Sequence, residues 1–163
     1  AFLGDFAKKV RAAGISPSQI TVELTGSDLP ADPATLIETL TRLRIAGYGL
    51  ALDDFGTGMA NFDMLRMCPF SELKIDRSLA QASVTDPLSC GVIETCATVS
   101  RELGMTLTAE GIETEAQEVT LRKLGVDMFQ GFLFGHGVVA AEFAARLLEE
   151  QPMSSLPATA SLS

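Results

Sequence analysis

Carboxylates and one amide recur along the sequence at the ends of short apolar runs. Each run has the length of a β-strand, and in α/β barrels and open parallel sheets the carboxyl ends of the strands face one common crevice. These polar groups are therefore expected to converge in space although they are widely separated in sequence. They are Glu23, the pair Asp53 and Asp54, Asp76, Glu110 and Gln130.

Such a cluster suits a hard divalent metal ion. Carboxylates gathered in a partly buried cleft repel one another and lose hydration, and a cation offsets both effects. Oxygen ligands suit Mg²⁺, Mn²⁺ or Ca²⁺, and the three cysteines and single histidine of this chain form no zinc-binding pattern. Asp53 and Asp54 are the sharpest candidates, because a turn immediately after them can bring both carboxylates onto one metal ion or onto two.

Lys74 lies two residues before Asp76, so the period of a strand predicts that both side chains share one face. Two interpretations are open for this lysine. It can form an ion pair that holds Asp76 and Asp53, or it can orient an attacking water molecule and stabilise the charge of a phosphate. The glycines of Gly56-Thr57-Gly58 also resemble a phosphate-cradling turn, but short loops of this kind are common.

The elements that must position these residues alternate between strand-like and amphipathic helical runs, which is typical of parallel βα units. Five units are predicted, in a domain over residues 1–150 that is followed by a flexible tail over 151–163. The segment 53–58 is expected to be a loop. Strands are predicted over 20–24, 48–52, 72–75, 106–109 and 127–132, and helices over 2–13, 28–45, 62–67, 87–103, 115–124 and 141–149.

Composition narrows the class of protein. The 163 residues are 47% hydrophobic and 20% charged, which is enough apolar material for one packed core and excludes a disordered chain. The net charge of −9 argues against binding to nucleic acids or anionic lipid. We expect a cytoplasmic domain without a membrane segment, although a longer parent protein, indicated by the absence of an initial Met, could be membrane-tethered.

Five segments, in this order and spacing, resemble the EAL-domain cyclic di-GMP phosphodiesterases. The resemblance implies a (β/α)8 TIM-like barrel, incomplete here with about five βα units, which hydrolyses cyclic di-GMP to linear pGpG with two Mg²⁺ or Mn²⁺ ions. It also implies a homodimer in bacterial signal transduction and an upstream sensory, receiver or GGDEF-type domain in the parent protein. The segments are Val22-Glu23-Leu24-Thr25, Leu52-Asp53-Asp54-Phe55-Gly56-Thr57-Gly58, Leu73-Lys74-Ile75-Asp76-Arg77-Ser78, Ala109-Glu110-Gly111-Ile112-Glu113-Thr114 and Gln130-Gly131-Phe132-Leu133-Phe134.

The same resemblance assigns roles to single positions. Glu23, Asp53 and Asp54 match metal ligands, and Lys74 matches the catalytic lysine near the attacking water, with Glu23 and Glu110 counted among the catalytic acids. Three further residues, Asp76, Gln130 and Glu113, match groups that surround the substrate and the ligands.

The sequence also departs from the family pattern. The segment that names the family, with a metal-binding Glu and a phosphate-contacting Arg, and a metal-binding Asn after it, would precede Ala1. Gly26 stands where the family usually has a Glu, residues 59–62 replace the usual loop sequence, and Gly137 stands where Pro is usual. Two functions therefore stay open: a metal-dependent phosphodiesterase, or a catalytically degenerate EAL domain that serves as a cyclic di-GMP receptor or a protein-interaction module.

Overall fold

The fold is built on one parallel sheet whose strands follow one another in chain order. A computed structural model describes residues 2–25, 33–56 and 62–150, and within them the order is β1-β2-β3-β4-β5. This confirms the predicted α/β class with five βα units. Successive strands lie side by side as in a (β/α)8 barrel, but the described strands form an open sheet. The strands are β1 (Thr21–Thr25), β2 (Gly49–Phe55), β3 (Glu72–Ile75), β4 (Thr106–Ala109) and β5 (Met128–Phe129).

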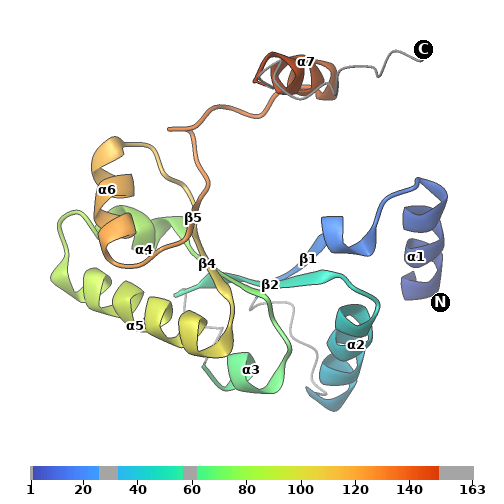
Figure 1. Cartoon of the computed structure of the whole chain (residues 1–163). Coiled ribbons are helices and arrows are strands. Elements are labelled where there is room, and N and C mark those ends of the chain that lie inside the picture. The colour runs from blue at the N-terminus through green and yellow to red at the C-terminus, as the bar shows by residue number, and fades with distance from the viewer. Residues whose placement is uncertain (1, 26–32, 57–61, 151–163) are drawn as a thin grey trace, which may run out of the picture.

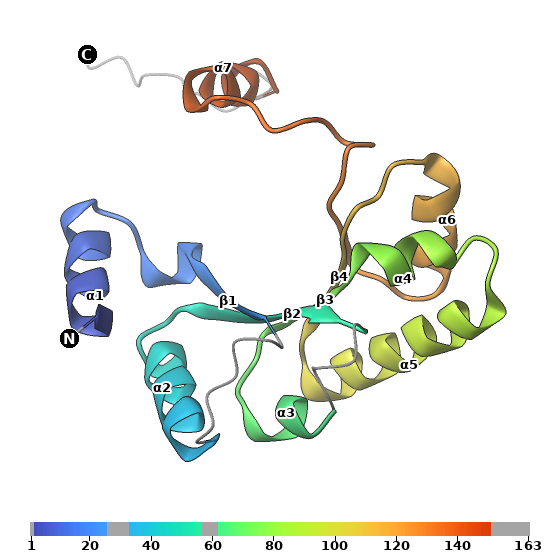
Figure 2. The same cartoon turned by 180° about the vertical axis from the view of Figure 1, so that it is seen from behind.

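Helices gather along one side of the sheet, while α7 stands apart from that layer (Figures 1 and 2). Helix α1 lies beyond the β1 end of the sheet, and its Val10 belongs to the common core. The longest, α5, runs along the layer, and α3 lies between it and α2. The helices are α1 (Phe2–Ala12), the 3₁₀ turn η1 (Pro17–Gln19), α2 (Pro33–Ile45), α3 (Phe62–Met67), α4 (Arg77–Ala82), α5 (Pro87–Leu103), α6 (Glu115–Lys123) and α7 (Ala140–Glu150).

The two faces of the sheet differ in chemistry because side chains alternate along a strand. Apolar residues of β2, β3 and β4 point to one face, where Leu52, Leu73 and Leu107 are fully buried in a common core with residues of the helices. The intervening positions carry polar side chains, among them Lys74 and Thr108, which are paired across the sheet in register. The core therefore lies between the sheet and the helices, and the polar face is left for chemistry.

Local signals explain why the helices begin and end where they do. Asp86 precedes α5 and accepts hydrogen bonds from the backbone N–H groups of Leu88 and Ser89, and Gly104 ends the helix with a positive φ of 67°. Thr114 and Gln117 form a reciprocal capping box at the start of α6.

The structure corrects three sequence-based predictions. Asp53 and Asp54 belong to β2, which continues to Phe55, so the predicted loop begins too early. Helix α4 was not predicted, because its six residues are too few to show a helical period. The strand predicted over 127–132 shrinks to the two residues of β5, since the chain turns away after Phe129.

Some predictions fall outside the described residues. Gly26, the loop residues 57–61 and the tail 151–163 all lie there. Among the described residues, no helix is both long enough and apolar enough to cross a membrane.

Candidate active site at the carboxyl edge of the sheet

Lys74 on β3 lies at the centre of a cluster of carboxylates from neighbouring strands. Its Nζ donates a hydrogen bond of 2.7 Å to Oε1 of Glu23 on β1 and also forms an ion pair with Glu110, the residue directly after β4. Oδ1 of Asp53 on β2 is 3.8 Å from the same nitrogen. Of the polar groups predicted to converge, Glu23, Asp53 and Glu110 thus meet around Lys74 in the structure.

The lysine is held as an ammonium ion. Burial alone would lower the pKa of Lys74, whose side chain is only 5% exposed. The hydrogen bonds to Glu110 and Glu23, together with the charges of Glu110 and Asp53, outweigh burial and raise the pKa above its usual range. At neutral pH Lys74 can therefore donate hydrogen bonds and supply positive charge, but it cannot accept a proton.

Asp53 and Asp54 diverge from regular strand geometry. The pairing of β2 with β3 shifts between Leu52 and Phe55, and Asp54 has a positive φ of 56°. Its backbone N–H donates to Oδ1 of Asp53 over 2.9 Å. An irregularity of this kind can change the direction of a side chain. It lies within the strand and not in a turn after Asp54, where the sequence placed it.

Asp76 has a local role in the structure. It caps the start of α4, where its carboxylate accepts hydrogen bonds from the backbone and the hydroxyl of Ser78. The contacts of Lys74 within the described residues are with Glu23, Asp53 and Glu110 and do not include Asp76. The predicted ion pair of Lys74 with Asp53 is therefore present. The predicted pair with Asp76 is wrong, because β3 ends at Ile75 and the chain turns into α4.

Gln130 lies directly after β5 and is exposed. Its backbone N–H donates to the carbonyl of Ala109 over 2.9 Å, and its own carbonyl accepts from Ile112 over 3.0 Å. These bonds attach the backbone of Gln130 to the chain on either side of Glu110, at the carboxyl end of β4.

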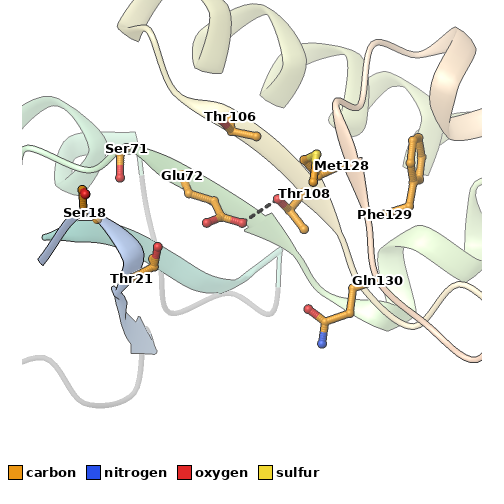
Figure 3. A pocket seen from close by; sticks show the side chains of 10 residues that line it. Ser18, Thr21, Ser71, Glu72, Thr106, Thr108, Met128, Phe129 and Gln130 are labelled. Carbon is orange, nitrogen blue, oxygen red and sulfur yellow. Dashed lines mark hydrogen bonds between the residues drawn. The ribbon is translucent and has the colours of Figure 1, made fainter. Parts of the chain in front are cut away.

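A pocket of about 540 Å³ occupies the opposite end of the same polar face. Its floor includes Glu72, whose Oε1 accepts a hydrogen bond of 2.6 Å from the hydroxyl of Thr108. Figure 3 shows this pair in the pocket, with Gln130 at one end and its side chain directed away from them. This pair was not predicted from the sequence, since Glu72 begins β3 and Thr108 lies inside β4, and neither stands at the carboxyl end of its strand.

Glu113 was predicted to surround the site, and its carboxylate pairs with Arg77 of α4 at 2.6 Å. Arg77 and Gly111 had no predicted role, although both lie within the recognised segments. The signal that could have drawn attention to them is their position, because each directly follows an acidic candidate, Asp76 or Glu110.

The residues present agree with a divalent metal in kind but supply only part of a site. The carboxylates of Glu23, Asp53 and Asp54 offer the oxygen ligands that Mg²⁺ and Mn²⁺ prefer. Within residues 2–25, 33–56 and 62–150, however, no group of three acidic, His or Cys side chains is arranged so that it could hold a metal ion. A complete metal centre would need further ligands or a rearrangement of these ones.

Comparison with known proteins agrees with this geometry. The EAL domain family matches residues 1–136. The chain is 41% identical over 129 residues to the cyclic di-GMP phosphodiesterase RocR of Pseudomonas aeruginosa, a match that covers 79% of this chain and 33% of RocR. It is 35% identical to the bifunctional diguanylate cyclase/cyclic di-GMP phosphodiesterase MucR of the same organism over 80% of this chain and 19% of MucR. The chain therefore spans a third or less of the length of these relatives.

Solved structures give the same result. The cyclic di-GMP complex of the PaMucR phosphodiesterase superposes with a TM-score of 0.79 at 32% identity, over 86% of this chain and 57% of the other. The manganese and cyclic di-GMP complex of BlrP1 from Klebsiella pneumoniae superposes with a TM-score of 0.76 at 30% identity, over 80% of this chain and 33% of BlrP1. With its parallel βα units, its acidic strand ends and a family match over most of its length, this chain belongs to the EAL domain family.

Proposed function

We propose that this chain forms the greater part of a domain that hydrolyses cyclic di-GMP to linear pGpG with the help of divalent metal ions. The observation that carries the proposal is the buried ammonium of Lys74, which is surrounded by Glu23, Asp53 and Glu110. Each of the four residues comes from a different βα unit. A fold needs no buried charge network at a strand edge, and such networks are costly unless they are well paired. A catalytic role at the carboxyl ends of the strands accounts for the charge network around Lys74.

The proposed roles follow from charge. Hydrolysis forms a bond from a water oxygen to phosphorus and breaks one phosphorus–oxygen bond of the ring. Lys74 orients the water or stabilises negative charge on the phosphate, and Glu110, paired with Lys74, orients the same water. Glu23 and Asp53 hold the ammonium in place from the other side.

Divalent ions have a natural place in this proposal. Glu23, Asp53 and Asp54 would hold them, and when bound, Mg²⁺ or Mn²⁺ activates water and stabilises the leaving oxygen. They also offset the repulsion between a protein of net charge −9 and a substrate with two phosphates. The manganese complex of BlrP1, which is 30% identical to this chain, supports this assignment.

The test is product formation from cyclic di-GMP by the longest natural protein that carries these residues. Conversion to pGpG with Mn²⁺ or Mg²⁺ is expected to fall at least about 100-fold in Glu23→Ala and Lys74→Ala variants. A Lys9→Ala variant, changed at an exposed lysine of α1, is the matched control and should retain full activity. A chelator should abolish turnover by the unaltered protein.

The second candidate function is a receptor that binds cyclic di-GMP without cleaving it. It is favoured by the lack of a ready three-residue metal cluster among the described residues. Saturable binding that is independent of metal and yields no product would establish the receptor and overturn the phosphodiesterase.

We further propose that the protein acts as a homodimer in which a separate sensory, receiver or GGDEF-type domain controls this one. The bifunctional nature of MucR supports the idea of a second domain in the same protein. Light scattering of the longest natural protein tests the dimer, for which a monomeric mass at micromolar concentration would be contrary.

A further inference from the structure

Two side chains of helix α4 bind to the segment that follows β4. Nη2 of Arg77 lies 2.6 Å from Oε1 of Glu113, and Nε2 of Gln81 donates a hydrogen bond of 3.3 Å to the carbonyl oxygen of Gly111. Arg77 and Gln81 are four residues apart, so they lie on the same face of the helix. The two contacts therefore act on one short stretch, residues 111–113.

Gly111 makes the close approach possible. Its φ of +67° lies in the left-handed region, and a Cβ atom built there would lie 2.2 Å from Cγ of Arg77. The aliphatic stem of Arg77 thus fills the space in which any other residue would carry its side chain. Glycine is needed here both for the backbone conformation and for the packing.

The other side of the segment is also fixed. Ile112 is fully buried, its N–H donates to the carbonyl of Gln130 over 3.0 Å, and its carbonyl accepts from Leu133 over 3.0 Å. Residues 111–113 are therefore held between α4 and the chain that follows β5. Glu110, directly before them, has its backbone N–H bonded to the carbonyl of Ile75 at 3.1 Å.

Stability alone does not explain the ion pair. The side chains of Arg77 and Glu113 are 56% and 38% exposed, and exposed ion pairs add little to the free energy of folding. The pair fixes the position of the segment after β4 relative to α4. Arg77 directly follows Asp76, and its partner Glu113 belongs to the stretch that directly follows Glu110. One contact therefore links the segments that end β3 and β4.

We propose that Arg77 is a positioning residue, which holds residues 111–113 and thereby fixes the carboxylate of Glu110 against Lys74. Its catalytic consequence rests on the proposed phosphodiesterase function, but its effect on the segment does not.

The experiment compares three variants of the longest natural protein. Arg77→Met keeps most of the stem and removes the charge, and Arg77→Lys keeps a charge without the planar fork. The matched control is Arg42→Met on α2, since Arg42 and Glu38 form another exposed ion pair of 2.6 Å that is remote from the site. Amide hydrogen exchange of residues 110–114 and steady-state kinetics with cyclic di-GMP are measured on each.

In Arg77→Met, amide exchange of residues 110–114 should become about tenfold faster, because the segment is no longer held. The kcat should fall about tenfold while KM stays within twofold, because a small displacement of a catalytic group lowers the reaction rate. Arg77→Lys should fall between this variant and the unaltered protein, and Arg42→Met should change neither quantity. An exchange rate within twofold of the unaltered protein would overturn the proposal, as would faster exchange with unchanged kcat. If the unaltered protein makes no pGpG, the proposed function fails, and the exchange rates still decide whether Arg77 holds the segment.

Discussion

A buried ammonium needs negative partners, and Lys74 finds them on three neighbouring βα units. Because Glu23, Asp53 and Glu110 all face this one cation, each carboxylate also depends on it for compensation. Removal of Lys74 leaves acidic groups that repel one another at the edge of the sheet.

We expect Lys74→Met to lower the free energy of unfolding by about 2 kcal/mol, less than for a fully buried network because Glu23 is half exposed. Urea denaturation at neutral pH measures this, with Lys9→Met on α1 as the control at an exposed lysine. A variant as stable as the control would show that the cluster does not depend on its cation.

Cys96 provides a pH-dependent contribution to stability. The thiol lies in α5 without solvent exposure, and burial raises its pKa from 9.0 to about 11. The folded state therefore holds the proton more tightly than the unfolded state. The stabilisation is complete below pH 9 and is lost as the pH rises through the folded-state pKa.

Between pH 8 and pH 11 the unaltered protein should thus lose about 2 kcal/mol more stability than a Cys96→Ala variant, since each pKa unit corresponds to about 1.4 kcal/mol. Urea titrations at a series of pH values measure both curves. Parallel curves would contradict the expected protonated thiol.

Some site residues were predictable because their signal is local. Glu23, Asp53 and Glu110 follow or end apolar runs, and the rule that parallel strands share a carboxyl edge brings them together. The contact between Arg77 and Gly111 was not predictable, since it depends on how α4 packs against the segment that follows β4, and α5 separates the two in the chain. The displacement of Asp76 to a helix cap was also missed, because a six-residue helix leaves no periodic trace.

At the scale of elements, two glycines illustrate opposite demands. A Cβ on Gly131 would lie 2.1 Å from the carbonyl oxygen of Ile112, at the junction that joins the segments after β4 and β5. Gly91 lies inside α5, where a Cβ would meet nothing within 4 Å.

Gly131→Ala is therefore expected to destabilise the protein by about 2 kcal/mol or more, because the new Cβ would overlap the backbone of Ile112, which cannot move aside. Gly91→Ala is expected to stabilise it by about 0.5–1 kcal/mol, since alanine favours a helix interior. Thermal unfolding of the two variants in parallel gives the comparison. A loss of stability in both would mean that α5 is constrained in a way that the described contacts do not show.

For the whole molecule, the order of the strands determines where the sheet is protected. Strands β2, β3 and β4 pair on both sides, whereas β1 and β5 pair on one side only among the described residues. The sequence predicted five strands, and the resemblance to a (β/α)8 barrel implied that successive strands are neighbours. The register of each pair could not be predicted, because hydrogen-bonded pairing involves residues far apart in the chain.

We expect amide exchange in β3 to be at least about tenfold slower than in β1, because central strands open only with the core. Hydrogen-exchange mass spectrometry of the 163-residue chain resolves the two strands. Equal protection of β1 and β3 would show that other residues cover the outer side of β1.

The alternation of faces also governs which length changes the gene can tolerate. Loss of a single codon inside β3 would exchange the two sides of the strand, placing an ammonium in the helical layer and a leucine among the acids. Loss of two codons would preserve the sides and shift the cluster along the strand. In a deletion scan through β3, the yield of folded protein should therefore depend on whether the number of missing residues is odd or even. Substitutions alone would not reveal this pattern.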